Sequence, residues 1–278
     1  MSDLFARFRE NRTAAAAGLF VLLITVLALA APVITPHDPL ALGDAPLAAP
    51  SGSHWLGTDQ LGRDIFTRII FGTRISLTIA AVGVGASLVA GTLMGLLAGY
   101  FRGWVDGSLS RVTDVMFSLP DILLALVIMA VLGPGFDRIA IAIAIVYTPI
   151  FARVCRGAVL GVTGQPFIEA ARAMGLSNAR ILLRHILPNI TGPLIVQTTL
   201  SLAFAILAEA ALSFLGLSGE ADAPSWGLML RQGKDFMEIA WWVAVFPGIA
   251  ITLTVLGFNL LGDGLRDAID PHHVTGRG

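Results

Sequence analysis

The sequence predicts an all-α integral membrane protein with six transmembrane helices. Of its 278 residues, 55% are hydrophobic and only 13% are charged, and apolar stretches long enough to span a bilayer recur along the chain. A soluble domain carries about 25% charged residues, so this composition excludes an ordinary water-soluble protein. It also excludes a disordered chain, which needs low hydrophobicity and high charge.

Charge, cysteine and histidine content narrow the function classes. The formal net charge is −1, from 18 basic and 19 acidic residues, which gives no basic field for a nucleic-acid partner. Cys155 is the only cysteine, so an intrachain disulfide and a multi-cysteine metal site are impossible. His37, His54, His272 and His273 are expected to be isolated and solvated, so the sequence predicts no metal site.

Each expected span is an apolar stretch of about 20 residues, the length that crosses a bilayer as a helix. A shorter sixth stretch, Ile139 to Ala152, lies between two arginines. Counting it as a span puts the arginine-rich segment 153–190 and both termini on one side, which the positive-inside rule identifies as cytoplasmic. The five longer stretches are approximately 13–34, 75–99, 115–132, 192–217 and 239–261.

The second span carries small residues at every fourth position. Gly83, Ser87, Gly91, Gly95 and Gly99 therefore share one helix face. Small residues let two helix backbones approach closely in a membrane. We expect these glycines to pack against another helix of the bundle or of a partner subunit. General tolerance of glycine in membrane helices is the alternative.

The segment between the first two spans, residues 35–74, is expected to lie outside the cell. Four prolines before residue 51 favour an extended, irregular chain there. From Asp64 to Phe71, apolar residues recur at helical spacing opposite Thr67 and Arg68. This pattern predicts a short amphipathic helix that lies on the membrane surface.

The cytoplasmic segment 153–190 predicts two short helices joined by a sharp turn. Pro166 is suited to open the first helix, and Glu169 in its first turn complements the helix dipole. Gly175 can adopt the left-handed conformation that ends a helix. Ser177 can then cap the second helix.

The two short helices present different faces. The first carries small residues at Ala170, Ala171 and Ala173, which suit docking into a groove on a soluble partner. A passive surface loop is the alternative. The second is expected to stop at Pro188. Because it has an apolar side and an arginine side, we expect it to lie at the inner membrane surface.

This cytoplasmic segment resembles the EAA loop of ATP-binding cassette (ABC) importer permeases. In that family the loop forms a coupling helix that docks into a cleft on the ATPase subunit. His185 stands where the family usually has isoleucine, and the run 184–189 resembles the variant of peptide and nickel permeases. The residues that the resemblance assigns to ATPase coupling are Glu169, Ala170, Ala171, Arg172, Ala173, Gly175, Ser177, Leu187 and Pro188.

Three further stretches resemble the C-type permease subunit of dipeptide/oligopeptide (peptide/nickel family) ABC importers. They are 56–77, 212–227 and 259–271. The resemblance covers nearly the whole chain and implies the type I ABC importer permease fold. It divides the chain into an N-terminal region with the first transmembrane helix and an extracytoplasmic segment (1–72), a permease core (73–266) and a cytoplasmic tail (267–278).

The resemblance implies a multi-pass permease subunit in a bacterial inner membrane. With a sister (B-type) permease it would form the pore for di-/oligopeptide uptake. Two ABC ATPase subunits would carry ATP and Mg²⁺, and an extracytoplasmic peptide-binding protein would deliver the substrate. The chain has no Gly-x-x-x-x-Gly-Lys-Ser/Thr loop, so we expect it to bind no cofactor and to have no catalytic residues.

Polar residues within the expected spans call for an explanation, because a carboxylate there is costly. One interpretation places Asp121, Glu209 and Asn259 along the translocation pathway. The alternative is a hydrogen-bonded packing contact or, for Asp121, a position near the inner interface.

Other functions are less consistent with the sequence. A nickel, glutathione or other small-solute permease of the same family remains an alternative. An ion-driven secondary transporter would not need the coupling-helix loop. An intramembrane enzyme is disfavoured because the sequence has neither a His-Glu-x-x-His motif nor a Gly-x-Ser-x-Gly motif.

Overall fold

The computed structural model describes residues 11–269, which form helices, connecting loops and an isolated β-bridge between Thr58 and Asp64. The all-α membrane fold is confirmed. Within the described residues, five helical segments are long and apolar enough to cross a membrane, or six if the bent pair α5 and α6 is one span. The helices are α2 (Arg12–Leu29), α3 (Ala31–Ile34), α4 (Ile65–Phe101), α5 (Gly103–Phe117), α6 (Asp121–Leu132), α7 (Phe136–Thr163), α8 (Pro166–Ala173), α9 (Asn178–Arg180), η1 (Ile181–Ile186), η2 (Leu187–Ile190), α10 (Thr191–Phe214), α11 (Trp226–Gly233), η3 (Lys234–Phe236) and α12 (Trp242–Ile269).

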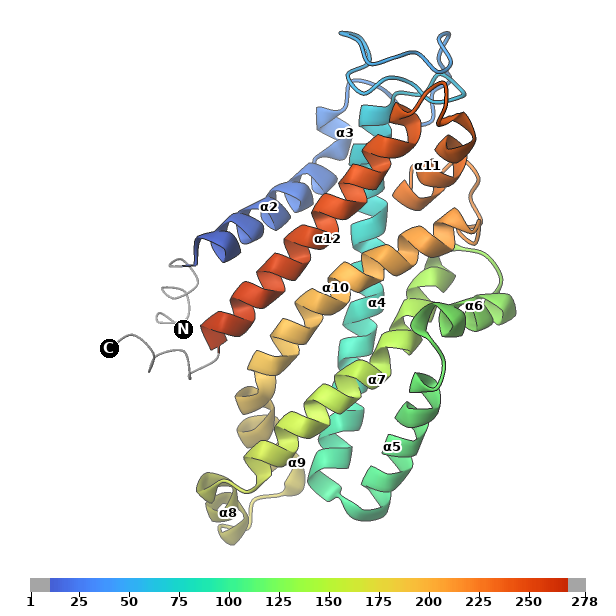
Figure 1. The fold of residues 1–278 in the computed structure, drawn as a ribbon. Helices are drawn as coiled ribbons and strands as arrows, with labels where there is room; N and C mark the ends of the chain where they lie inside the picture. Colours follow the sequence, from blue (N-terminus) through green and yellow to red (C-terminus); the bar gives the residue numbers. More distant parts are fainter. Residues whose placement is uncertain (1–10, 270–278) are drawn as a thin grey trace.

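Helix α4 runs the full length of the bundle (Figure 1). One end of the bundle, which we call the loop end, consists of residues 35–64 and 215–241. The opposite end, which we call the α8 end, carries α8 and the turn after it (Figure 1). Helices α7, α10 and α12 cross α4, and α2 packs along α12.

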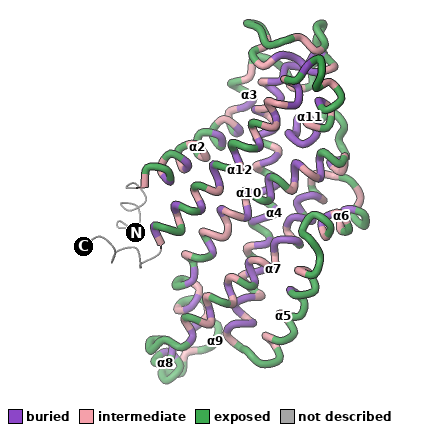
Figure 2. The backbone as a smooth tube through the Cα atoms, viewed as in Figure 1, coloured by how far each residue is buried: buried purple, intermediate pink, exposed green. Residues whose placement is uncertain are grey.

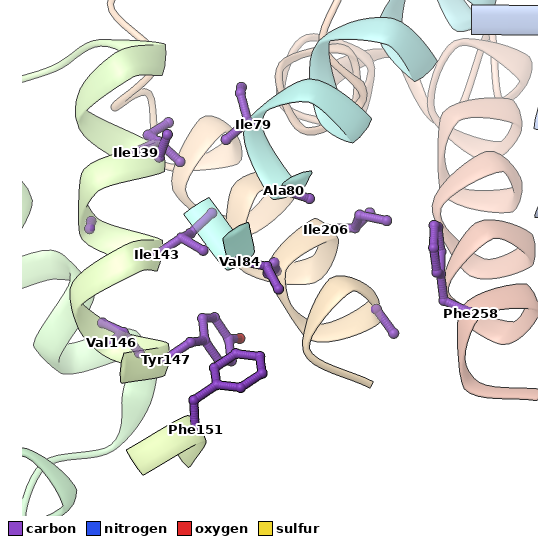
Figure 3. Packing of buried hydrophobic residues seen from close by; sticks show 14 of the residues in the cluster. Ile79, Ala80, Val84, Ile139, Ile143, Val146, Tyr147, Phe151, Ile206 and Phe258 are labelled. Carbon is purple, nitrogen blue, oxygen red and sulfur yellow. The ribbon is translucent and has the colours of Figure 1, made fainter. Parts of the chain in front are cut away.

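The small-residue face of α4 packs directly on α7. A Cβ atom built on Gly91 would lie 2.5 Å from the Cβ atom of Phe151, and one on Gly95 would lie 2.5 Å from that of Cys155. Gly83 and Gly99 meet α7 in the same way, at Ile143 and Val159. Figure 3 shows the larger side chains that complete this core, including Ile79 and Val84 of α4 and Ile143 and Phe151 of α7. The two backbones are therefore in close contact over about half the length of α4.

The prediction that residues 64–71 form an amphipathic helix on the membrane surface is wrong. These residues form the first turns of the 37-residue helix α4, and Asp64 caps it by accepting a hydrogen bond from the Thr67 backbone N–H at 2.8 Å. Thr67 and Arg68 are fully buried beneath the loop end and do not face solvent. Since the chain has no proline between Phe71 and the apolar span, the helix continues across Gly72, where the sequence suggested a regional boundary.

The expected third span is not a straight helix. Helices α5 and α6 meet at a 92° bend between Phe117 and Asp121. Pro120 lacks an N–H group and disfavours helical geometry at Leu119, so the chain turns here. Of this pair, only α6 is strongly apolar, and it has 12 residues. A helix of 12 residues alone is too short to cross a bilayer core of about 30 Å.

The helix after Gly175 does not stop at Pro188, where the sequence predicts its end. A π-helical turn (η1) and a 3₁₀ turn (η2) carry the chain directly into α10. Pro188 occupies the first turn of η2, where a missing N–H group costs little. Ile181, Ile186 and Ile190 are buried along this path, so packing overrides the helix-breaking tendency of proline.

The short stretch 139–152 belongs to the 28-residue helix α7, which continues past Arg153 as the sequence indicated. Burial is concentrated where α7 meets α4 and α10, whereas α5 and α8 are largely exposed (Figure 2). Helix α12 also continues past residue 266 to Ile269. Residues 1–10 and 270–278, part of the expected N-terminal region and tail, lie outside the described residues.

The packing of α4 on α7 predicts different effects for two glycine-to-alanine substitutions. Gly95→Ala would force its Cβ atom into the α7 backbone, at a cost of about 1–3 kcal/mol. Gly85→Ala is the matched control, because it lies on the same helix with open space around it and gains the same helix propensity. Thermal denaturation in detergent should show a lower midpoint for Gly95→Ala only. Equal midpoints would contradict the close contact.

Candidate functional site

Helix α8 is a short helix with a well-defined end. Pro166 is its first residue and Glu169 lies in its first turn. Gly175 has a φ of +74°, the left-handed conformation expected from the sequence. Its N–H donates to the Arg172 carbonyl at 2.9 Å, and the Leu176 N–H donates to the Ala171 carbonyl at 3.2 Å. This pair of bonds is a Schellman motif, so the turn after α8 is fixed by its own backbone.

The two sides of α8 differ in exposure. Ile168 and Ala171 are buried against the rest of the chain, so Ala171 cannot offer its side chain to a partner in this conformation. Ala170 is exposed, and it lies between Phe167 (43% exposed) and Met174 (71% exposed). Phe167, Ala170 and Met174 follow helical spacing and form one apolar face, which we call the α8 face. Sequence reasoning missed the two larger residues, although the i, i+3, i+7 pattern was available.

The α8 end is tied to the last turn of α4 through Tyr100. The Arg172 guanidinium carbon lies 5.2 Å from the centre of the Tyr100 ring. The Tyr100 hydroxyl donates a hydrogen bond to Asn178 Oδ1 at 2.8 Å. Tyr100 thus contacts both sides of the Gly175 turn. Ser177 stands at the N-cap position of α9 but makes no capping bond with its side chain, so the expected cap is absent there.

The remaining two residues assigned to the coupling segment lie in η2. Leu187 is half-buried and Pro188 is exposed. They occupy the connection from the Gly175 turn into α10.

Two arginine–aspartate pairs hold α5 against α7. Arg156 donates to both oxygens of Asp106, with the second bond, from Nη2 to Oδ2, at 2.7 Å. Arg153 pairs with Asp114 at 3.0 Å and lies 4.0 Å above the Phe117 ring. In the sequence these arginines indicate only membrane orientation. The structure gives them a second role, as bidentate and stacked contacts between α7 and α5.

Glu209 is fully buried between α10 and α4. Its Oε2 accepts a hydrogen bond from the Ser76 hydroxyl at 2.6 Å, and its Oε1 accepts one from Ser213 at 2.8 Å. Both carboxyl oxygens therefore have partners, as a buried polar group requires. The geometry matches the packing alternative that the sequence left open.

Asp121 borders a cavity of about 290 Å³ between α6, α7 and α10, which Tyr147 and Phe204 also line. The cavity is mainly apolar, and the exposed Asp121 carboxylate lies at the start of α6. Asn259 lies half-buried on α12. The structure thus does not gather Asp121, Glu209 and Asn259 into one site. Asp121 lines the cavity, Glu209 joins α10 to α4, and Asn259 lies on α12.

The loop end contains a buried charge cluster that sequence reasoning missed. Arg63 is 1% exposed, and it donates to Asp59 Oδ2 at 2.7 Å and to Asp222 Oδ1 at 3.0 Å. Arg68 is fully buried and donates to the Pro39 carbonyl at 3.0 Å. Because Asp59 and Arg63 lie in a loop before α4, no helical spacing in the sequence signalled this pair. These contacts fasten both loop segments onto the start of α4.

His37 and His54 are not isolated, contrary to the expectation from the sequence. Their ring centres lie 5.1 Å apart at the loop end. His54 also contacts Asp64, with Nδ1 and Oδ1 separated by 3.0 Å. His272 and His273 lie outside the described residues.

Comparison with known protein families identifies two matches along the chain. Residues 91–273 match the family described as "Binding-protein-dependent transport system inner membrane component". Residues 1–50 match "N-terminal TM domain of oligopeptide transport permease C". The first match covers more than half of the chain.

Curated relatives cover almost all of the chain. The dipeptide transport system permease protein DppC of Alkalihalophilus pseudofirmus is 45% identical over 97% of this chain and 89% of the relative. The glutathione transport system permease proteins GsiD of Pectobacterium atrosepticum and Escherichia coli O157:H7 are 46% and 48% identical. Each match covers 97% of this chain, and 90% and 89% of the respective relatives.

Solved structures share the fold. An inward-facing MetNI methionine ABC transporter chain matches with a TM-score of 0.61 and 20% identity, over 74% of this chain and 98% of that one. A chain of an amino acid ABC transporter matches with a TM-score of 0.55 and 17% identity, over 73% and 94%. At such identities the likeness shows the fold alone.

The hydrogen bonds of Glu209 predict how two substitutions differ. Glu209→Gln keeps an acceptor and adds a donor, so both serines retain a partner, and stability and transport should stay near wild type. Glu209→Leu leaves both hydroxyls without this partner and should cost about 1–2 kcal/mol. Thermal denaturation and an uptake assay check both. A stable Glu209→Gln variant that has lost transport would instead support a pathway role.

Proposed function

The chain belongs to the binding-protein-dependent transport system inner membrane components and is a permease subunit of an ABC importer, and on that premise we propose that it forms a peptide-conducting pore with a sister permease. Residues 73–266 would form the core of this chain's half of the pore. Two ATPase subunits would bind ATP and Mg²⁺ and hydrolyse the nucleotide. A peptide-binding protein would deliver substrate at the loop end.

The proposed substrate class is short peptides. It rests on the named relatives, which carry dipeptide and glutathione and are each at least 45% identical over nearly the whole chain. Both solutes are small molecules with amide bonds, a free amino group and carboxylates. A glutathione-type solute is therefore the second candidate, and competition between the two in an uptake assay would separate them.

The α8 face is the observation that supports coupling to an ATPase. Phe167 and Met174 expose apolar surface on either side of the small residue Ala170, a shape suited to a groove on a soluble partner. Glu169 would complement the start of the α8 dipole, and Arg172 would link α8 to Tyr100. We propose that the α8 end and both termini lie in the cytoplasm, which the arginines of segment 153–190 favour.

The proposed motion follows from these contacts. ATP binding would draw the two ATPases together and displace α8. Because Tyr100 joins the Gly175 turn to α4, and α4 packs closely on α7, the displacement would move α4 and α7 as one body. The cavity beside Asp121 lies against α7 and α10, so it would change shape in this motion. We propose Asp121 as a pathway residue on this ground.

Uptake into proteoliposomes tests the proposed function. The complete assembly would be reconstituted with the binding protein and a labelled dipeptide outside the vesicles and ATP inside. We expect accumulation that requires both ATP and the binding protein. Accumulation without ATP, driven by an ion gradient, would favour a secondary transporter.

The α8 face gives a variant with a matched control. Ala170→Arg places a long charged side chain on the docking face and should lower uptake about tenfold or more, equivalent to a loss of about 1.4 kcal/mol. Ala170→Ser stays small and should transport normally. The amount of each variant in the membrane controls for folding. Normal uptake by Ala170→Arg would refute docking through this face.

A further inference from the structure

Three side chains with metal-binding atoms meet at the loop end. His37, His54 and Asp64 each place one potential ligand atom within 4.8 Å of the other two. His54 Nδ1 and Asp64 Oδ1 are 3.0 Å apart. This is close to the separation of about 3.3 Å between ligands of a tetrahedral zinc ion with bonds of about 2.0–2.1 Å. His37 is exposed, so rotation of its side chain can close the remaining distance.

Backbone contacts hold each of the three residues in place. Asp64 caps α4 through its Oδ2 atom, which leaves Oδ1 directed at His54. His54 lies in a turn closed by a hydrogen bond from the Ser51 N–H to the His54 carbonyl at 2.8 Å. The chain next to His37 is held by the bond from Arg68 to the Pro39 carbonyl. The cluster therefore does not depend on a freely moving loop.

The charges around the cluster leave Asp64 available to a cation. Among the ion pairs within residues 11–269, both Asp59 and Asp222 pair with arginine, whereas Asp64 pairs with His54 alone. Asp64 is 4% exposed, and a buried carboxylate paired only with an imidazole gains from a cation at this position. The contact of His37 that a metal would replace is weak, a 3.3 Å approach of Nε2 to the Ser53 carbonyl.

We propose that His37, His54 and Asp64 form a binding site for one zinc-class divalent ion. Two imidazole nitrogens and a carboxylate oxygen are suitable ligands for Zn²⁺, and water from the exposed side of His37 would complete a tetrahedron. Hard cations such as Mg²⁺ prefer all-oxygen ligand sets and would bind poorly. The bound ion fastens residues 36–39 and 51–56 to the N-terminus of α4, and so to the helix that runs to the α8 end.

Zinc titration of the full-length chain tests the proposal. The protein is purified in detergent with an affinity tag free of histidine, and His272 and His273 are replaced by alanine in every variant to remove the tail histidines. We expect about one Zn²⁺ per chain with no comparable binding of Mg²⁺. Zinc-edge X-ray absorption should show two imidazoles at the bond lengths of about 2.0–2.1 Å typical of such sites.

Single substitutions assign the ligands. His37→Ala, at an exposed position, should weaken Zn²⁺ binding at least about tenfold without affecting folding. Asp64→Asn keeps a good N-cap residue while removing the carboxylate, and should weaken binding by a similar factor. His185→Ala, on η1 at the α8 end, is the control and should bind as the parent does. Absence of stoichiometric Zn²⁺ binding, or equal affinity in His37→Ala and the parent, would overturn the proposal.

Discussion

The close contact between the glycine face of α4 and the α7 backbone is the constraint on which the rest of the structure depends. At Gly91 and Gly95 an added Cβ atom would lie 2.5 Å from α7 side chains. In a membrane, where apolar side chains gain little by leaving lipid, such backbone proximity is a main source of helix association. The buried hydrophobic cluster includes residues of both helices around this contact, among them Val84 of α4 and Ile143 and Phe151 of α7.

A single continuous helix therefore links the two ends of the molecule. The start of α4 is held by the Arg63 and Arg68 cluster at the loop end, and its last turn meets the α8 turn through Tyr100. Glu209 ties the same helix to α10 at an intermediate level. With α7 packed on it, α4 is suited to carry a displacement of α8 toward the loop end.

Local sequence patterns predicted most helices and turns correctly. The wrong predictions concern residues whose structure depends on tertiary contacts. The apolar spans, the small-residue spacing of α4 and the left-handed Gly175 turn are properties of short sequence windows. Burial of Arg68, by contrast, depends on Asp222, more than 150 residues away, so residues 64–71 looked amphipathic in isolation. Pro188 was expected to end a helix. The helical path continues through it because the neighbouring isoleucines are buried by tertiary packing, which the local sequence does not reveal. His37 and His54 meet because a loop returns to the start of α4.

We propose that this chain works as one subunit of an ATP-driven assembly coupled through α8. Purification from the native membrane in mild detergent, with quantitative mass spectrometry of what accompanies the chain, tests it most directly. We expect a second permease and ATPases with nucleotide-binding motifs in amounts comparable to the chain. We expect Ala170→Arg to lose the ATPases but to keep the second permease. A chain recovered alone, or with partners that include no ATPase, would contradict it.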